Sequence, residues 1–385
     1  MEDGMRRERV LVAMSGGVDS SVAAALLLEQ GYQVVGVTMR LWTIEDPDAP
    51  RLHRRCCSVE DIADAREAAD VLGIPHYVLN MERHFYTWVV DPFLREYASG
   101  RTPNPCIACN QYIKFGPLLD YAEALGCQFV ATGHYVRRRQ EGDRFLLLKG
   151  VDPLKDQSYV LYMLGQKELA RALFPVGEYT KEQVRAMARG WRLPNANKPD
   201  SADICFIPEG DYRSFVRQRM ETRPGPIVDR QGNVLGYHQG IIAYTIGQRR
   251  GLPPHGGGRP LYVVDLDPHA NAVVVGPEEE LYTQEAWCTA LSFVEGQAPQ
   301  GPILVEAKVR YRSEAVPASL EVVGRRGYVR FLRPQRAVTP GQAIVFYQGE
   351  KVLGGGIIAR RLWEAAQEGD IIQPHLVAAG GEKWG

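Results

Sequence analysis

The first two hundred residues alternate short apolar runs with longer segments of helical character. The apolar runs 10–14 and 33–39 predict buried strands, and the Ala/Leu-rich segment 22–30, which ends at Gly31, predicts a helix closed by a glycine. The other predicted elements are strands at 77–79 and 127–132 and helices at 58–73, 111–125, 156–164 and 181–190. Such alternation predicts a doubly wound parallel α/β sheet, whose ligands bind at the carboxyl ends of its strands.

After about residue 208 the pattern changes to glycines, prolines and short β-branched runs. Closely spaced apolar runs then predict strands at 303–309, 318–323, 328–332, 343–347 and 352–358. Short strands at this spacing indicate a small β-barrel. We therefore expect an α/β domain, a small connecting domain, a C-terminal β-barrel and a flexible tail, at residues 1–208, 209–278, 279–363 and 364–385.

Composition adds few constraints. A chain of 385 residues suits about two or three domains. Because 45 Lys and Arg residues balance 46 Asp and Glu residues, any nucleic-acid surface must come from local groups of charge. Candidate groups are Arg137-Arg138-Arg139, Arg249-Arg250 and Arg325-Arg326.

Targeting and membrane features are not evident. The arginines near the start are not followed by the apolar core of a signal peptide, and the apolar stretch 22–28 is too short to span a bilayer. We therefore expect a cytoplasmic protein without a membrane partner.

Seven cysteines, an odd number, point to thiol or metal chemistry rather than to a disulfide scaffold.

The turn between the first predicted strand and helix reads Ser15-Gly16-Gly17-Val18-Asp19-Ser20. Its small residues allow backbone N–H groups to approach an anion at the start of a helix. It lacks the Gly-Lys-Ser/Thr ending of the Walker loop. The turn instead resembles the PP-loop of the ATP pyrophosphatases, which split ATP into pyrophosphate and an adenylated substrate.

Three cysteines stand out as candidates for chemistry. Cys106 and Cys109 form a Cys-x-x-Cys pair, and the neighbouring Pro103 and Pro105 exclude a helix interior, so we expect a loop there. Cys205 lies near the end of the α/β region. We interpret two other cysteines as small buried hydrophobic residues and leave the role of an adjacent pair open; these are Cys127 and Cys288, and Cys56 and Cys57.

A series of motifs follows the turn at 15–20 along the chain. In order they are Gly100–Pro105, Ala131–Tyr135, Lys155–Tyr159, Ile204–Phe206, Thr245–Gly251, Val309–Arg312, Val338–Gln342 and Leu353–Gly356. Over about residues 8–362 this series resembles the tRNA-specific 2-thiouridylase family, which thiolates the wobble uridine of certain tRNAs. The resemblance implies ATP-dependent adenylation of uracil O2 with release of pyrophosphate, followed by sulfur transfer.

The resemblance also implies roles for individual residues. Cys205 would carry a persulfide received from a sulfur-relay protein or a cysteine desulfurase, and Cys109 would be the attacking thiolate. Mg²⁺ would bridge the ATP phosphates, with Asp19 as a ligand. The implied ATP-binding residues are Ala13, Met14, Ser15, Gly16, Gly17, Val18, Asp19, Ser20, Met39 and Gly133.

The implied RNA partner is the anticodon arm of tRNA, whose wobble base must be flipped out to react. Asn104, Pro105 and Cys106 would contact that base. The other implied tRNA contacts are His134, Lys155, Asp156, Gln157, Arg310, Tyr311 and Gln342.

One position departs from the family pattern, since many members have Asp where this chain has Cys106. Cys106, Cys109 and Cys205 would then suit a 4Fe–4S cluster with one open iron, or a zinc ion, so the cluster and persulfide mechanisms both remain open. Two other classes also remain. One is a PP-loop synthetase that adenylates a different substrate, and the other is a non-catalytic RNA-binding protein.

Overall fold

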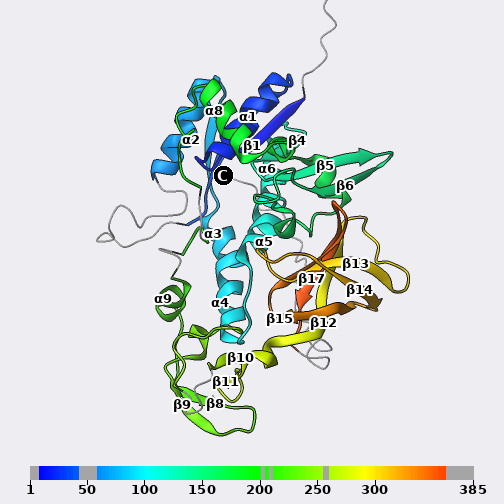
Figure 1. Ribbon diagram of the computed structural model, residues 1–385. Helices are drawn as coiled ribbons and strands as arrows, with labels where there is room; N and C mark the ends of the chain where they lie inside the picture. Colours follow the sequence, from blue (N-terminus) through cyan, green and yellow to red (C-terminus); the bar gives the residue numbers. More distant parts are fainter. Residues whose placement is uncertain (1–7, 43–58, 201–203, 208–210, 255–259, 361–385) are drawn as a thin grey trace, which may run out of the picture.

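A computed structural model describes residues 8–42, 59–200, 204–207, 211–254 and 260–360. Its strands form a five-stranded sheet, a four-stranded sheet and an eight-stranded sheet. In Figure 1 the five-stranded sheet lies at the top with its helices, the four-stranded sheet at the bottom, and the eight-stranded sheet to one side. The predicted fold class, a parallel α/β sheet followed by a small domain and a β-barrel, is confirmed.

The five-stranded sheet is parallel throughout, in the order β3-β2-β1-β4-β7. Its strands are β1 (Arg9–Ala13), β2 (Gln33–Arg40), β3 (His76–Asn80), β4 (Phe129–Thr132) and β7 (Ala172–Leu173). The chain proceeds outward from β1 to β3 and then returns to place β4 on the other side of β1. The topological switch point, where such sheets bind ligands, therefore lies between β1 and β4.

Helices cover both faces of this sheet. Val10 and Val12 of β1 share a core with helices α1 (Val18–Glu29) and α2 (Val59–Leu72). Leu11 belongs to the core on the opposite face, which includes α6 (Pro117–Ala124). Burial on both faces explains why β1 is a continuous apolar run rather than an alternating one. Helix α8 (Lys181–Gly190) packs beside α1 through Val184 and Ala188 (Figure 1).

Two predicted helices of this region differ from the structure. The helix predicted at 111–125 is divided into η3 (Asn110–Lys114) and α6, because Gly116 and Pro117 interrupt it. The helix predicted at 156–164 is wrong, since only η4 (Ser158–Val160) is helical there. The buried residues Tyr159 and Leu161 of this turn produced the misleading apolar pattern.

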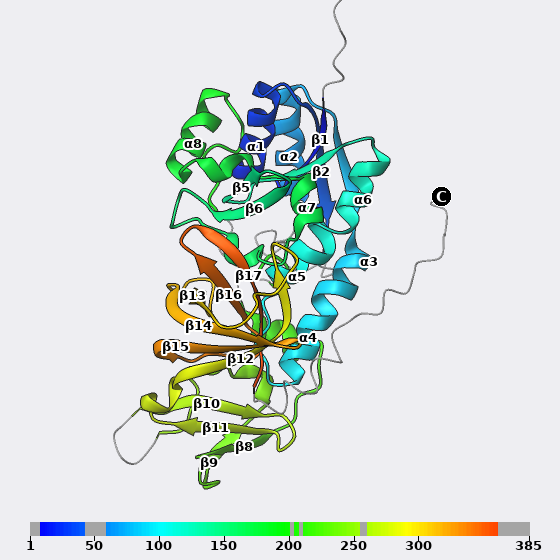
Figure 2. The same ribbon diagram turned by 90° about the vertical axis from the view of Figure 1, so that its right-hand side faces the viewer.

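Several elements of the α/β region were not predicted. The helices α3 (Glu82–Phe85), η2 (Tyr86–Val90) and α4 (Asp91–Ala98) form a column that descends from the parallel sheet toward the four-stranded sheet (Figure 2). The others are the hairpin of β5 (Val136–Glu141) and β6 (Arg144–Lys149), and the helices α5 (Pro105–Cys109), α7 (Gln166–Arg171) and η5 (Pro175–Glu178).

The C-terminal strands close into a six-stranded barrel. Its order is β12-β15-β14-β13-β16-β17, and a pairing of β12 with β17 completes the ring. The strands are β12 (Tyr282–Phe293), β13 (Ile303–Lys308), β14 (Val316–Val323), β15 (Arg326–Arg336), β16 (Ala343–Gln348) and β17 (Lys351–Ile358). The hairpin β5–β6 of the α/β region extends this sheet through β6 and β17, so the barrel and the α/β region share hydrogen bonds.

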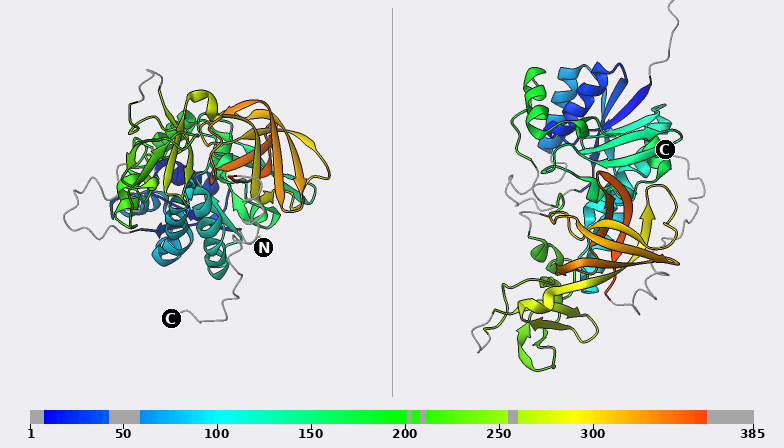
Figure 3. Two further views of the ribbon diagram at one scale, coloured as in Figure 1. Left: turned by 90° about the horizontal axis from the view of Figure 1, so that it is seen from below. Right: turned by 45° about the vertical axis from the view of Figure 1, so that its right-hand side comes forward.

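The four-stranded sheet lies beyond the barrel, at the end of the molecule opposite the parallel sheet (Figure 3). Its order is β10-β11-β8-β9, formed by β8 (Gly225–Val228), β9 (Val234–His238), β10 (Tyr262–Asp267) and β11 (Ala272–Gly276). The flanking helices are α9 (Tyr212–Arg217), η7 (Ile241–Ala243) and η8 (Glu278–Leu281). Within the described ranges, no helix is both long and apolar enough to cross a bilayer.

Candidate functional site

The residues expected to bind ATP gather at the carboxyl ends of three neighbouring strands. Ala13 ends β1, Met39 lies next to the end of β2, and Gly133 follows β4. The turn 14–17 connects β1 to α1, which begins at Val18. These positions coincide with the switch point of the sheet, as the ligand rule for such folds requires.

Close backbone packing at the turn excludes side chains at two glycines, Gly16 in the turn itself and Gly133 after β4. Gly16 has a φ of +73°, and a Cβ there would lie 2.3 Å from the backbone oxygen of Asp61. A Cβ on Gly133 would lie 2.7 Å from backbone atoms of Asp19 and Ser20. Gly133 therefore allows β4 to approach the start of α1, whose first N–H groups lack partners within the helix and are suited to bind an anion.

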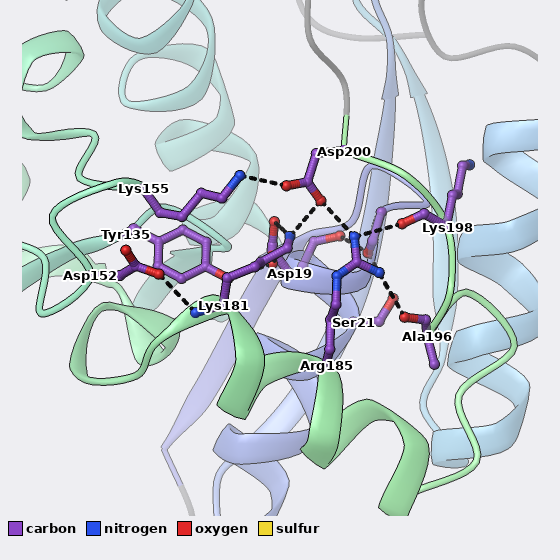
Figure 4. Close-up of polar contacts among 12 residues, drawn as sticks. Asp19, Ser21, Tyr135, Asp152, Lys155, Lys181, Arg185, Ala196, Lys198 and Asp200 are labelled. Atoms are coloured by element: carbon purple, nitrogen blue, oxygen red, sulfur yellow. Dashed lines mark hydrogen bonds and ion pairs between the residues drawn. The ribbon is translucent and has the colours of Figure 1, made fainter. Parts of the chain in front are cut away.

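Asp19 is the centre of a charged network at this helix start (Figure 4). It accepts hydrogen bonds from the Tyr135 hydroxyl at 2.7 Å and from Lys181 Nζ at 2.7 and 2.8 Å. Lys181 also pairs with Asp200 at 2.7 Å. Burial, together with the charge of Asp19, raises the pKa of Tyr135, so its hydroxyl remains a donor.

Sequence reasoning identified Asp19 but missed Lys181, Asp200 and Arg185. These residues come from segments that meet only after the sheet has folded. One local feature marks Lys181, because it follows the helix cap Thr180, whose side chain accepts from the Gln183 N–H at 3.3 Å. A cation at the first position of a helix is unfavourable for that helix's dipole, which is a reason to suspect a role outside it.

The Cys-x-x-Cys pair lies on a short helix, so the prediction of a loop was wrong. Pro105 is the first residue of α5, where its missing N–H and fixed φ are tolerated. The Asn104 side chain caps the helix by accepting from the Cys106 N–H at 3.1 Å. Cys106 is exposed, whereas Cys109, one turn further on, is buried.

Cys205 is exposed and lies near Cys106. The adjoining Phe206 and Ile207 are buried in the same core as Cys109, and the Phe206 ring lies 5.3 Å from Phe93 of α4. Although Cys106 touches solvent, its partial desolvation by the surrounding protein raises the pKa of its thiol. The charge of Cys205 raises this pKa further, to about 11, while Lys114 opposes the shift.

The three thiols do not fit a metal cluster in this arrangement. Across the described ranges, no group of three or more His, Cys, Asp or Glu residues is placed to hold a metal ion. Cys127 and Cys288 are buried at 2% and 0% exposure, as the sequence predicted. Cys56 and Cys57 lie outside the described residues.

The residues 155–157, expected to contact tRNA, bind other parts of the chain. Lys155 Nζ lies 2.8 Å from Asp200, and the Asp156 carboxylate accepts from the Ser158 hydroxyl at 2.7 Å. Gln157 accepts from the Tyr135 N–H at 2.9 Å. This segment therefore connects the charged network around Asp19 to the barrel side of the site.

His134 is buried at 8% exposure, with its Nδ1 2.7 Å from the Thr132 hydroxyl. Burial, with a smaller contribution from Lys114, holds the pKa of His134 well below its ordinary value. The imidazole is therefore neutral at pH 7 and cannot attract a phosphate by charge.

The barrel contributes its predicted residues at the junction with α5. Gln342 Nε2 donates to the Thr102 carbonyl at 2.8 Å, and the Thr102 N–H donates to the Pro340 carbonyl at 2.9 Å. Arg310 donates to the Thr339 hydroxyl at 2.9 Å and so braces the same turn. Tyr311 lies beside Asp156 and Cys106, since both of their charges act on its hydroxyl. The barrel therefore positions the segment that leads into α5.

The switch-point turn, the capped Cys-x-x-Cys helix and the closed barrel define a PP-loop α/β protein with two appended β domains. Three family models match it in sequence order: a tRNA methyl transferase HUP domain at residues 8–209, a tRNA methyl transferase PRC-barrel domain at 213–277 and an aminomethyltransferase β-barrel domain at 283–358. The chain belongs to the tRNA-specific 2-thiouridylase family, because curated members match it over nearly their whole length.

One such member, tRNA-specific 2-thiouridylase MnmA 1 of Caldanaerobacter subterraneus subsp. tengcongensis, is 50% identical over 359 residues, covering 92% of this chain and 98% of the relative. The MnmA proteins of Carboxydothermus hydrogenoformans and Chloroflexus aggregans are 51% and 52% identical, covering 94% and 91% of this chain and 100% and 98% of the relatives. Among solved structures, a 4-thiouridine synthetase–RNA complex with bound ATP matches at 17% identity and a TM-score of 0.34, over 55% of this chain and 50% of that one. That score is too low to support an argument.

Proposed function

We propose that this protein is a cytoplasmic tRNA-uridine 2-sulfurtransferase. It adenylates O2 of the wobble uridine at the expense of ATP and then replaces that oxygen with sulfur. The supporting observation is that one domain holds both an anion-binding turn at its switch point and the neighbouring thiols of Cys106 and Cys205. The anticodon arm of tRNA and a persulfide-donating sulfur-relay protein or cysteine desulfurase are the proposed partners.

ATP binds in this proposal at the turn and the strand ends around it. The residues present suit a polyanion, because Lys155, Lys181 and Arg185 gather there around the carboxylates of Asp19 and Asp200. Asp19 is the proposed ligand of a Mg²⁺ ion that bridges the phosphates. The proposed ATP contacts are residues 13–20 with Met39 and Gly133. ATP provides adenylate, which converts a poor leaving oxygen into a good one.

Sulfur transfer proceeds from a persulfide on Cys205. Its terminal sulfur attacks C2 of the adenylated uracil, and AMP departs with the original oxygen. Cys109 then attacks Cys205 Sγ, which forms a Cys109–Cys205 disulfide and releases the 2-thiouridine as its thiolate. An external thiol reductant resets the two cysteines. Because Cys109 is buried, this step requires its thiol to become accessible to Cys205.

The wobble base is proposed to bind against Asn104, Pro105 and Cys106. Cys106 retains its proton at neutral pH because its pKa is about 11, so it can donate a hydrogen bond to the base. The proposed tRNA contacts around this pocket are His134, Lys155, Asp156, Gln157, Arg310, Tyr311 and Gln342. We propose the domain limits 1–208, 209–278 and 279–363; the tail expected at 364–385 lies outside the described residues.

Pyrophosphate release tests the class of function. We expect release from ATP to depend on added bulk tRNA. A PP-loop synthetase with another substrate would release pyrophosphate without regard to tRNA, and a non-catalytic RNA-binding protein would release none. Analysis of tRNA nucleosides from a strain lacking the protein then identifies the modified base.

The sulfur step is tested by two single substitutions. We expect Cys109→Ser and Cys205→Ser to abolish 2-thiouridine formation while ATP and tRNA binding remain largely unchanged. Near-normal thiolation by either variant would disprove the persulfide route. Anaerobic purification distinguishes the cluster alternative, because stoichiometric iron lost in Cys106→Ala would favour a cluster and full activity without iron would exclude it.

A further inference from the structure

The carboxylate of Asp200 is held by cations from three positions on two segments. Lys155 Nζ lies 2.8 Å from Asp200 Oδ2, while Lys181 Nζ and Arg185 Nη2 lie 2.7 and 3.0 Å from Oδ1 (Figure 4). Asp200 is one-third exposed. Desolvation works against its charge, but hydrogen bonds from Lys155 and Lys181 prevail and hold the pKa of Asp200 at about 2.

These cations are placed where an anion is expected to bind. Lys181 bridges Asp200 and Asp19, and Asp19 lies in the first turn of α1, directly after the glycine turn. Arg185 is oriented in advance, because it also donates to the carbonyls of Ala196 and Lys198, each at 3.0 Å. All three cations pair with Asp200, whereas only Lys181 also pairs with Asp19, so removal of Asp200 would leave Lys155 and Arg185 without these ion pairs. Such a cluster suits phosphate oxygens.

We propose that Asp200 occupies the position of the terminal phosphates of ATP and is displaced from Lys155, Lys181 and Arg185 when the nucleotide binds. This inference rests on the proposed function, because it assumes that the glycine turn binds a triphosphate. Asp200 then acts as an internal counterion for these cations until nucleotide binds. It lowers nucleotide affinity, since the bound carboxylate must leave first.

Displacement of Asp200 has a consequence for Cys205, which follows only five residues later. A chain of that length spans at most about 18 Å, so Cys205 lies within that distance of Asp200. Phe206 and Ile207 anchor the far side of this stretch in the core. Nucleotide binding is therefore coupled to the environment of the sulfur-carrying thiol.

Calorimetric titration with a non-hydrolysable ATP analogue and Mg²⁺ tests the proposal. We expect Asp200→Asn to bind the analogue about tenfold more tightly than the wild type, because several partly exposed ion pairs no longer compete. The matched control is Glu182→Gln, which removes an exposed negative charge next to Lys181 that has no ion pair with these cations, and we expect little change. Asp200→Ala provides a second variant in case the amide disturbs the fold.

If Asp200 instead orients the three cations for the phosphates, both Asp200 variants will bind the analogue more weakly. Equal or weaker binding overturns the proposal. If the wild type binds no nucleotide, the proposed function fails as well, which distinguishes the two failures.

The rate at which N-ethylmaleimide modifies Cys205, followed by peptide mass spectrometry, supplies a second readout. The analogue should change this rate about threefold or more in the wild type, and Asp200→Asn without nucleotide should react like the nucleotide-bound wild type. An identical Cys205 rate with and without analogue contradicts the coupling of nucleotide binding to Cys205.

Discussion

At the residue scale, Gly133 allows a strand end to contact the glycine turn. Its absent side chain leaves room for backbone atoms of Asp19 and Ser20, and a Cβ would approach them to 2.7 Å. Backbone at this distance cannot move as a flexible side chain does. We therefore expect Gly133→Ala to shift the start of α1 and to weaken ATP binding by tenfold or more, a cost of about 1.4 kcal/mol.

The matched control for this substitution is Gly190→Ala. A Cβ at Gly190 meets nothing within 4 Å, and this residue ends helix α8. Calorimetry should show unchanged nucleotide affinity for Gly190→Ala. Equal affinities for the two variants would show that the close approach at Gly133 is unimportant for the nucleotide site.

Cys106 provides a prediction about pH. Its raised pKa, about 11, means that the protonated thiol dominates at neutral pH and that the thiolate forms only as pH rises toward that value. Since the thiolate is the nucleophile, alkylation of Cys106 at pH 8 should be roughly two orders of magnitude slower than that of a peptide cysteine with a pKa of about 8.5.

Iodoacetamide kinetics at Cys106, followed by peptide mass spectrometry between pH 7 and 11, measure this directly. The rate should continue to rise over the whole interval. A plateau below pH 9 would mean that Cys106 is an activated thiolate and not a proton donor.

At the element scale, the short helix α5 depends on its cap. Replacing Asn104 with Ala removes the acceptor for the Cys106 N–H and should cost about 1 kcal/mol of stability. Asn104→Ser can still cap the helix and should restore the melting temperature. Because we also propose that Asn104 contacts the wobble base, thiolation should remain impaired in Asn104→Ser. Recovery of both stability and thiolation would assign Asn104 a capping role alone.

The helix α5 also shows where sequence reasoning falls short. Prolines around 103–105 exclude a helix interior but are compatible with a helix start, and the pattern alone does not distinguish these cases. The helix predicted at 156–164 was wrong for a different reason. Its residues are buried by contacts with distant strands, as when Tyr159 donates to the carbonyl of Ala343 at 2.8 Å. By contrast, the helix 181–190 agreed with the structure because both of its limits are set locally.

At the scale of the whole molecule, the pattern of apolar runs predicted the α/β sheet and the barrel but not their junction. Gln342, expected at the tRNA, bonds to Thr102 across the two domains, a pairing of residues 240 positions apart. The network of Asp19, Lys181 and Asp200 is of the same kind. Periodicity and local spacing report neighbours along the chain, so these long-range contacts became visible only with the fold.

The arginine groups at 137–139, 249–250 and 325–326 lie on separate domains, and they lead to a prediction for tRNA binding. If the anticodon arm contacts several of them at once, its association constant should fall steeply with salt, with a logarithmic slope that corresponds to several phosphates. A titration at four or five salt concentrations measures the slope. The variant Arg249→Gln with Arg250→Gln should reduce it, and a slope near zero in the wild type would contradict a phosphate-tracking surface.

The central claim is that ATP cleavage and cysteine-borne sulfur meet at one uridine. It is tested most directly by quantifying pyrophosphate and 2-thiouridine together, with purified protein, Mg²⁺-ATP, a persulfide donor, a thiol reductant and tRNA from a strain lacking this thiolation. We predict one pyrophosphate for each 2-thiouridine formed, and pyrophosphate without thiolation for Cys205→Ser. Thiolation without pyrophosphate release, or pyrophosphate release that is the same with and without tRNA, would contradict this claim.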